Sequence, residues 1–375
     1  MKKILATAFL VALSTQSCTQ ETTLKAGDDT AADGRLVFST SLDHDKTRGT
    51  GGQTRSAAMT DAAAMASAGG FKVWAVSHDE PWAETPDTKT AILDGVTVTG
   101  NQSGTVWSYD DPVEWPDGRY VSFFAIAPAS VAVDGSATAG TLSTSYTVDP
   151  DPADQTDLVF AHPVYDRTGS TYSAGRPLTL NFGHALSRIV FTGIILNESG
   201  SDPRTVKVTG ITLDGLYDSG TADLDVPIEW TLSGTASASY SLSRGEGELV
   251  DVALSTAAPV SLIPSDGYLF LVPQSLERAA GAEPTMSVTL EISDQEGLNP
   301  QTIVAPARSL FSPSEWLAGK SYEYRVIVDG DDVRIVGAAM ADLTLEPWKV
   351  SVYINPVVMV QGNPDKNAAK FGAAI

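Results

Sequence analysis

The sequence predicts an all-β fold, either a sandwich or a barrel, with little helix. Three observations support this class. Short runs rich in Val, Ile, Thr and aromatic residues recur along the chain, turn-forming Gly, Pro and Asp residues separate them, and few segments have a helical composition. The chain has 375 residues, which is enough for two domains with separate cores.

Each predicted strand is a short run in which β-branched and aromatic residues dominate. Turn signals such as Asp266-Gly267 lie between these runs. Residues 57–68 are rich in alanine and methionine and predict a helix, and 314–317 predict a single helical turn. The predicted strands cover residues 36–42, 71–76, 95–99, 120–127, 178–182, 189–196, 206–213, 268–272, 286–292, 321–328 and 333–336.

The N-terminus has the layout of a secretory signal. A positive start, Met1–Lys3, precedes the apolar run Ile4–Leu13, which is too short to span a bilayer as a stable helix. The single cysteine of the chain, Cys18, follows shortly after. This placement predicts removal of residues 1–17 and lipid attachment to Cys18, whose acyl chains would hold the protein on a membrane. The alternative is a plain signal peptide with an incidental cysteine.

The formal net charge of −22 narrows the classes of partner. Nucleic-acid binding needs clustered Lys and Arg to neutralise phosphates, so the charge argues against it. It also argues against a polybasic membrane patch, and an acidic surface favours solubility after export. Because lipidation would consume Cys18, the fold would depend on core burial without disulfides.

Changes in composition suggest the domain limits. Residues 18–34 are polar and lack periodicity, as in a flexible tether. A stretch rich in Gly, Ser and Thr at 166–177 is the best candidate for a domain boundary. We therefore expect a first β domain over 35–175, a second over 176–348, and a C-terminal strand and tail over 349–375.

The sequence shows no recognisable catalytic or metal-binding pattern. The acidic runs 149–154 and 329–332 do not have calcium-loop spacing and are interpreted as solvated turns. We expect a protein that is not an enzyme and carries no cofactor. Nucleophile-elbow and metal-ligand spacings are missing around all four histidines, which are His44, His78, His162 and His184, the last interpreted as structural.

The seven tryptophans raise the question of carbohydrate binding. Trp82 lies in a loop beside Pro81 and is the candidate for an exposed ring. The others lie in or beside apolar strand segments and are predicted to be core residues: Trp74, Trp107, Trp115, Trp230, Trp316 and Trp348.

Several segments, taken in order, resemble the fimbrillin family, the subunits of type V pili made by Bacteroidetes. Leu180–Ile189 (LNFGHALSRI) follows the family's F-x-H-A-L-x-[KR] strand, and Trp316–Tyr324 (WLAGKSYEY) follows its W-x-x-G-x-x-Y-x-Y strand. Further markers lie at 71–75, 157–161 and 347–348. The resemblance extends from the signal to about Trp348.

The resemblance implies two tandem β-sandwich domains with transthyretin-like topology. It also implies export as an outer-membrane lipoprotein and cleavage after an arginine by a trypsin-like surface protease. Cleavage would remove the lipidated leader together with the strand at 36–42. A strand from a neighbouring subunit would then fill the groove that is left.

Two arginines lie in the polar, glycine-rich segment 43–58 that follows this strand. Arg48 precedes a glycine and most resembles the family's processing site, and Arg55 is the alternative. Both could also be ordinary loop charges.

The C-terminal run Lys349–Val360 alternates and is rich in Val, Ile and Tyr, which predicts a strand. This strand is either built into its own subunit or donated in part to the next one. Pro356 lacks an N–H group and would suit a hinge between the two parts. The residues expected to lie in the acceptor's groove are Val357, Val358, Met359 and Val360.

The expected function is therefore that of a structural subunit of a surface fimbria, with a role in adhesion. Its expected partners are other fimbrillin subunits, the outer membrane before processing, and a host or bacterial surface ligand. Shaft, tip and anchor roles all remain open. The alternative is a glycan-binding lipoprotein of the outer membrane that does not polymerise, and a surface hydrolase ranks last.

Overall fold

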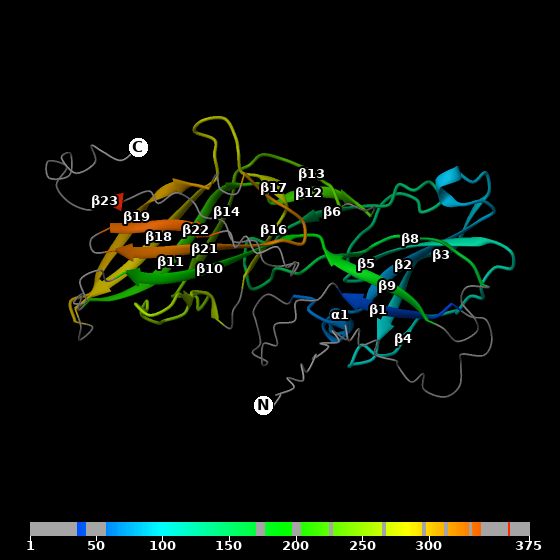
Figure 1. The fold of residues 1–375 in the computed structure, drawn as a ribbon, viewed down its shortest axis with the longest axis horizontal. Helices are drawn as coiled ribbons and strands as arrows, with labels where there is room; N and C mark the ends of the chain where they lie inside the picture. Colours follow the sequence, from blue (N-terminus) through cyan, green and yellow to red (C-terminus); the bar gives the residue numbers. More distant parts are fainter. Residues whose placement is uncertain are drawn as a thin grey trace, which may run out of the picture.

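The computed structural model describes residues 36–42, 58–169, 177–196, 204–224, 228–264, 268–294, 298–310, 314–329, 332–338 and 359–360. Two groups of large sheets lie end to end along the long axis of the molecule (Figure 1). The predicted all-β class is confirmed, because α1 (Ala62–Ser67) and the single 3-10 turn η1 (Trp82–Glu84) are the helical elements of the described residues.

The first half is built on one eight-stranded sheet in the order β1-β9-β7-β5-β2-β3-β4, with β8 beside β5. The pairing of β1 with β9 is parallel, and every other pairing in this sheet is antiparallel. Its strands are β1 (Phe38–Leu42), β2 (Phe71–His78), β3 (Lys89–Gly100), β4 (Trp107–Ser108), β5 (Tyr120–Ala127), β7 (Val159–Ala161), β8 (Val164–Arg167) and β9 (Leu178–His184).

This sheet curls until its two ends meet. The backbone N–H of Leu36 donates to the carbonyl of Val113, just beyond β4, over 2.8 Å, and the Tyr109 hydroxyl donates to the Leu36 carbonyl over 3.0 Å. The curled sheet and α1 enclose one hydrophobic core. Because side chains alternate across a strand, the opposite face of β2 and β5 turns away from this core and joins a second one.

The second half has two further sheets. One has the order β15-β10-β21-β22-β23 with β16 beside β10, and the other has the order β14-β11-β18-β19. Buried residues alternate along β10, β11 and β18, and the large hydrophobic ones belong to the second core, so the two sheets face each other across it. The strands are β10 (Ser187–Leu196), β11 (Thr205–Leu216), β14 (Ala238–Ser243), β15 (Val260–Ser261), β16 (Leu269–Leu271), β18 (Thr285–Ser293), β19 (Gln301–Ser309), β21 (Ser321–Asp329), β22 (Asp332–Ala338) and β23 (Met359–Val360).

One smaller sheet connects the halves: β13-β12-β6 joins β6 (Ser143–Thr147) to β12 (Ser219–Asp223) and β13 (Trp230–Leu232). Another lies within the second half, where β17 (Gln274–Ser275) pairs with β20 (Glu315–Trp316). The chain passes from the first large sheet to the second at Ala185 and Leu186, between β9 and β10. The division at 175/176 into two tandem sandwiches stays a prediction, and β9, which lies beyond it, is a strand of the first sheet.

Every predicted strand from 36–42 to 333–336 overlaps an observed one. The helix predicted over 57–68 is shorter than expected, because Asp61 caps α1 by accepting a hydrogen bond from the Ala64 N–H. The turn predicted at 314–317 is wrong, since Glu315 and Trp316 pair with β17 as β20. Within the described residues we find no helix with the length and apolar character needed to cross a membrane.

Candidate functional site

The most unusual feature of the first half is how deeply the side chains at 36–42 are buried in its core. Leu36, Phe38 and Leu42 are 0%, 5% and 5% exposed, so the strand predicted at 36–42 is a buried part of the fold. These residues are separated by two and four positions, as a strand with one buried face requires. Figure 1 shows β1 on the side of the curled sheet where α1 lies.

Aromatic packing holds the centre of this strand. The Phe38 ring meets Phe71 and Phe123 edge-on, with ring centroids 6.2 Å apart in both pairs. It also meets Tyr109, with centroids 5.7 Å apart. Edge-to-face contacts of this kind add to the free energy of apolar burial, so Phe38 is the main anchor of β1.

Backbone pairing of β1 is confined to one side. Five residues of β1 pair in parallel with β9, from Phe38 with Leu178 to Leu42 with Phe182, and β1 ends the strand order of the sheet. On the outer face, Ser39 shares a hydroxyl hydrogen bond of 2.9 Å with Thr179, and Ser41 donates to Asn181. The sheet therefore places this strand at an edge, with a parallel partner.

Thr40 is the exception in the inward row of β1. It lies between Phe38 and Leu42 in the alternation and pairs in register with the buried Leu180. Its Oγ1 atom is buried and has no hydrogen-bond partner, although the residue as a whole is half-buried. A buried hydroxyl without a hydrogen-bond partner lowers the stability of the fold. The Thr40 side chain is therefore poorly suited to the apolar site that it occupies.

A buried Asp–His pair lies where the described chain resumes, at residues 58 and 59. The Met59 N–H donates to Asp157 Oδ2 over 2.9 Å, and His184 Nδ1 lies 2.8 Å from the same oxygen. Asp157 is fully buried and His184 is 5% exposed. Met59 itself is 1% exposed, so the chain is fixed in the core from this residue onward.

Two tyrosines adjoin this pair from the second core. Burial raises the pKa of Tyr146 to about 12, and the negative charge of Asp157 adds to the effect. Burial likewise raises the pKa of Tyr268 to about 12, against the opposing charge of Arg188, whose guanidinium lies 4.4 Å above the Tyr268 ring. Both phenols therefore stay neutral at ordinary pH.

Several predicted site residues lie outside the described part of the chain. They include the lipidation candidate Cys18, both processing candidates, Arg48 and Arg55, and the donor-strand residues Val357 and Val358. The remaining donor candidates, Met359 and Val360, pair antiparallel with Val333 and Asp332 of β22 as the short strand β23.

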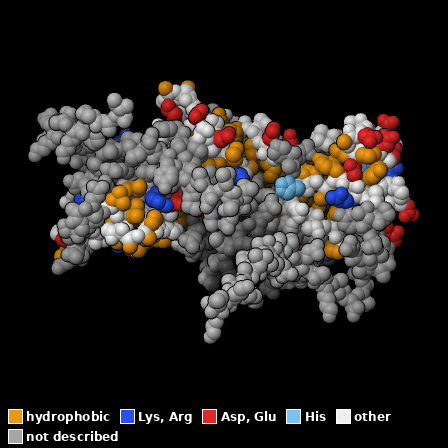
Figure 2. All heavy atoms as spheres, viewed as in Figure 1, with side chains coloured by type: hydrophobic (Ala, Val, Ile, Leu, Met, Phe, Trp, Pro, Cys, Tyr) orange, Lys and Arg blue, Asp and Glu red, His pale blue; other side chains and the backbone are white. Residues whose placement is uncertain are grey.

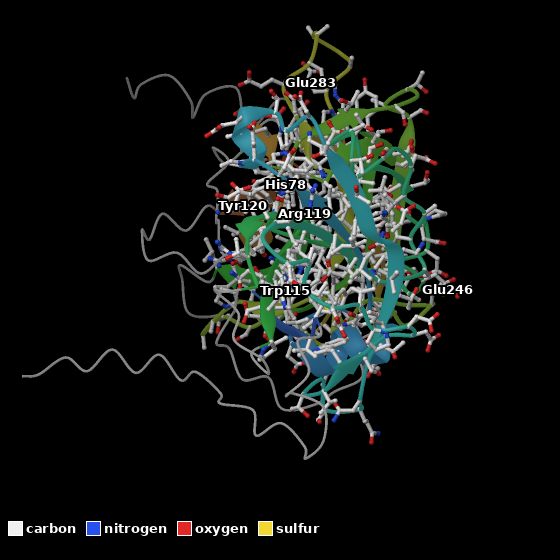
Figure 3. All side chains as sticks on the ribbon, turned by 90° about the vertical axis from the view of Figure 1, so that its right-hand side faces the viewer. His78, Trp115, Arg119, Tyr120, Glu246 and Glu283 are labelled. Atoms are coloured by element: carbon white, nitrogen blue, oxygen red, sulfur yellow. The ribbon has the colours of Figure 1, made fainter. Side chains whose placement is uncertain are left out.

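The other functional candidates are structural in the described residues. His78 is fully buried, with Nε2 2.9 Å from Ser122 Oγ and Nδ1 2.6 Å from the Glu80 carbonyl. Figure 3 shows it beside Arg119 and Tyr120 at the end of the first half, and its ring stacks on Tyr120. No group of His, Cys, Asp and Glu among the described residues has the arrangement of a metal site.

The tryptophans give no exposed aromatic platform in the described residues. Trp82 packs against Phe124 and Tyr165, and the Lys89 ammonium covers its ring at 4.1 Å. Trp115 and Trp230 are half-buried, and Trp74, Trp107 and Trp316 are buried. The carboxylates gather instead on the outer end of the first half (Figure 2), where Asp79, Glu80, Glu84 and Asp87 are exposed.

Sequence reasoning did not find the partnership between Asp157 and Met59. Asp157 and His184 both lie in segments that stood out in the sequence, 157–161 and 180–189, but nothing there indicates that the two segments meet. Residues 59 and 157 are 98 positions apart, and only the pairing of β7 with β9 brings Asp157 to His184.

One family model and several solved structures match the chain. The family model described as fimbrillin-like matches residues 54–348. A solved fimbrial protein from Bacteroides vulgatus is 16% identical, with 80% of this chain and 97% of that chain covered and a TM-score of 0.61, which supports the same fold.

Two further solved structures are more distant. A candidate cell adhesion protein from Bacteroides uniformis is 14% identical, covers 81% of this chain and 96% of its own, and has a TM-score of 0.47. A fimbrial assembly protein from Parabacteroides distasonis is 13% identical, covers 80% and 94%, and has a TM-score of 0.32. None of the curated proteins matches the chain.

Proposed function

The chain belongs to the fimbrillin-like family, and on that premise we propose that it is a structural subunit of a surface fimbria that assembles by strand exchange. In this scheme the precursor is exported as a lipoprotein on Cys18 and is cut after Arg48, or alternatively after Arg55. Residues 36–42 leave with the leader. A strand of a neighbouring subunit then takes their place beside β9.

The observation that carries this proposal is the combination of deep burial and one-sided pairing in β1. Its inward side chains fill the first core, but its backbone pairs with β9 alone among the strands of the sheet. A strand paired on both sides could not leave without breaking two ladders. β1 can leave by breaking one ladder, together with the two hydrogen bonds that Leu36 makes to Val113 and Tyr109.

Loss of β1 would leave an open groove beside β9. Burial of each large apolar side chain contributes about 1.5–3 kcal/mol, so removal of Leu36, Phe38 and Leu42 uncovers a surface that favours a replacement. The groove would also present the free backbone edge of β9. An incoming strand could satisfy both the pockets and the edge, which is the physical basis of strand addition.

The retained part of the subunit would begin close to Met59. The hydrogen bond from Met59 to the buried Asp157 fixes the chain there, and both candidate cleavage sites precede it. Processing at either arginine would therefore leave the rest of the first core intact. The donated strand in this scheme contains Val357, Val358, Met359 and Val360, of which Met359 and Val360 form the short β23 in the undonated state.

Two variants test the proposal in cells that make the fimbria. The double substitution Arg48→Ala and Arg55→Ala should abolish processing and leave lipidated monomers on the surface. Deletion of residues 356–375 should leave a folded monomer that cannot polymerise. Normal SDS-resistant ladders from either variant would contradict the scheme, and a Lys46→Ala variant serves as the control for a neighbouring charge that is not an arginine.

A further inference from the structure

The inward face of β1 contains one polar side chain, Thr40, in an otherwise apolar row. Its neighbours two residues away on each side are Phe38 and Leu42, and its partner across the ladder is Leu180. All three are buried. The hydroxyl oxygen is buried and has no hydrogen-bond partner among the described residues, which makes its burial costly.

The outward face of β1 shows that this is not a general property of its hydroxyl groups. Ser39 and Ser41 lie on that face, and each has a side-chain partner on β9, Thr179 and Asn181. The polar residues of β1 are thus satisfied where the strand meets solvent. The mismatch is confined to the position that faces the core.

We propose that the site occupied by the Thr40 side chain is where the groove discriminates between incoming strands. This site favours an apolar side chain donated by a second copy of this chain. This inference rests on the proposed function. An apolar side chain of similar size fills the same space without burying an unpaired hydroxyl, so it binds more tightly than β1 does. The mismatch makes β1 easy to displace.

The C-terminal run has the required composition. Val357, Val358, Met359 and Val360 are all apolar, so either phase of an extended strand presents apolar side chains to the groove. By contrast, the inward row of β1 contains a threonine. Exchange therefore replaces a strand with one defect by a strand without it.

Competition between peptides tests this selection. In the unlipidated full chain with Lys25→Gln and Arg35→Gln, trypsin cannot separate Cys18 from residues 36–42, so the lone Cys18 takes a fluorescent label, limited trypsin cleavage cuts within 43–57, and the labelled fragment should remain on the groove. Unlabelled peptides of residues 36–42 then compete for the groove. The Thr40→Val peptide should displace the fragment at about one tenth of the concentration that the unchanged peptide needs.

The matched controls are the Thr40→Ser peptide and the Ser39→Val peptide. The serine peptide should compete no better than the unchanged one, because it keeps the hydroxyl. The Ser39→Val peptide changes the outward face and should stay within about twofold of the unchanged peptide. An equal gain for Ser39→Val and Thr40→Val would overturn the inference, because the gain would then reflect strand propensity alone.

The remaining outcomes separate this inference from the proposed function. If every peptide displaces the fragment with equal strength, the selection at Thr40 is wrong and strand exchange stands. If no peptide displaces it, the groove does not open, and both fail. A peptide of residues 355–361 should compete better than unchanged 36–42, and a weaker result would overturn the choice of a second copy as the donor.

Discussion

The first strands of the two halves, β1 and β10, have related positions and different degrees of attachment. Each is parallel to a long strand of its own sheet, β1 to β9 and β10 to β21. β10 pairs over nine residues with β21 on one side, and with β15 and β16 on the other. β1 pairs over five residues on one side.

The inward rows of the two strands differ as well. β10 places Ile189, Phe191 and Ile195 in the second core, and all three are buried. β1 and the adjoining Leu36 place Leu36, Phe38 and Leu42 in the first core, but β1 adds the unpartnered Thr40 hydroxyl. If β1 is exchanged as proposed, burial alone does not keep a strand in its subunit. Pairing on both sides and an inward row without an unpartnered polar atom are then the features expected to retain β10.

The largest expected difference comes from truncating the central phenylalanine of each strand. Phe191→Ala should cost about 3–5 kcal/mol and should abolish both folding and assembly, because β10 stays in the subunit. Phe38→Ala should lower the unfolding free energy of the precursor by a similar amount. Polymers made from it should match wild-type polymers in SDS resistance, since residue 38 has left. Urea unfolding and gel analysis measure the two effects, and weakened Phe38→Ala polymers would show that β1 is retained.

A smaller effect on stability is expected at Asp157, beside the start of the part of the chain that the proposed scheme retains. Asp157→Asn weakens the contact with His184 and the hydrogen bond from Met59, and should cost about 2–3 kcal/mol. Limited proteolysis should then cut beyond residue 59, inside α1. Asp151→Asn is the control, because Asp151 accepts from Ala153 in its own exposed loop. Equal protease patterns for the two variants would contradict the anchoring role of Asp157.

A change at Gly193 should sharpen the contrast between the inward rows. A Cβ at this position of β10 would lie 2.5 Å from Leu254 Cδ2 and 3.1 Å from Leu262 Cδ2, so the inward row of β10 leaves no space for an added methyl group. Gly193→Ala should cost about 1 kcal/mol in unfolding free energy. Thr40→Val in the precursor should raise stability instead. Thermal unfolding of both variants compares them directly, and a stabilising Gly193→Ala would mean that the two rows are equally loose.

The smallest effects should come from the outward faces. In β10, Thr192 donates to Glu323 over 2.6 Å, and Arg325 also contacts that carboxylate at 2.6 Å. Glu323→Gln should cost about 0.5–1 kcal/mol, less at high salt. Thr179→Ala, which removes the partner of Ser39, should cost no more than about 0.5 kcal/mol and should not depend on salt. Unfolding at two salt concentrations distinguishes the pairs, and equal salt dependence would remove this difference.

The sequence was sufficient to predict the strands because their signal is local. β-Branched runs and turn residues lie within a few positions of each other, and 36–42 was expected to be a strand of the fold. Its position at the sheet edge could not be predicted. That position depends on β9, and the contact between Ser39 and Thr179 joins residues 140 positions apart.

The same limit applies to the candidate site. The apolar residues of β1 were visible in the sequence, but whether the Thr40 hydroxyl finds a partner depends on what the fold places around it. The helix limits were also uncertain, because alanine-rich composition does not mark a start and the cap at Asp61 does. The features that distinguish β1 from β10, namely the edge position and the unpartnered inward hydroxyl, therefore depend on contacts between residues that are far apart in the sequence.

N-terminal sequencing of subunits taken from surface fimbriae tests the central claim most directly, namely that β1 is absent from the assembled protein. The account predicts chains that begin at Gly49 or Ser56 and contain no residues from 36–42. Assembled subunits that still begin at Cys18 would contradict it.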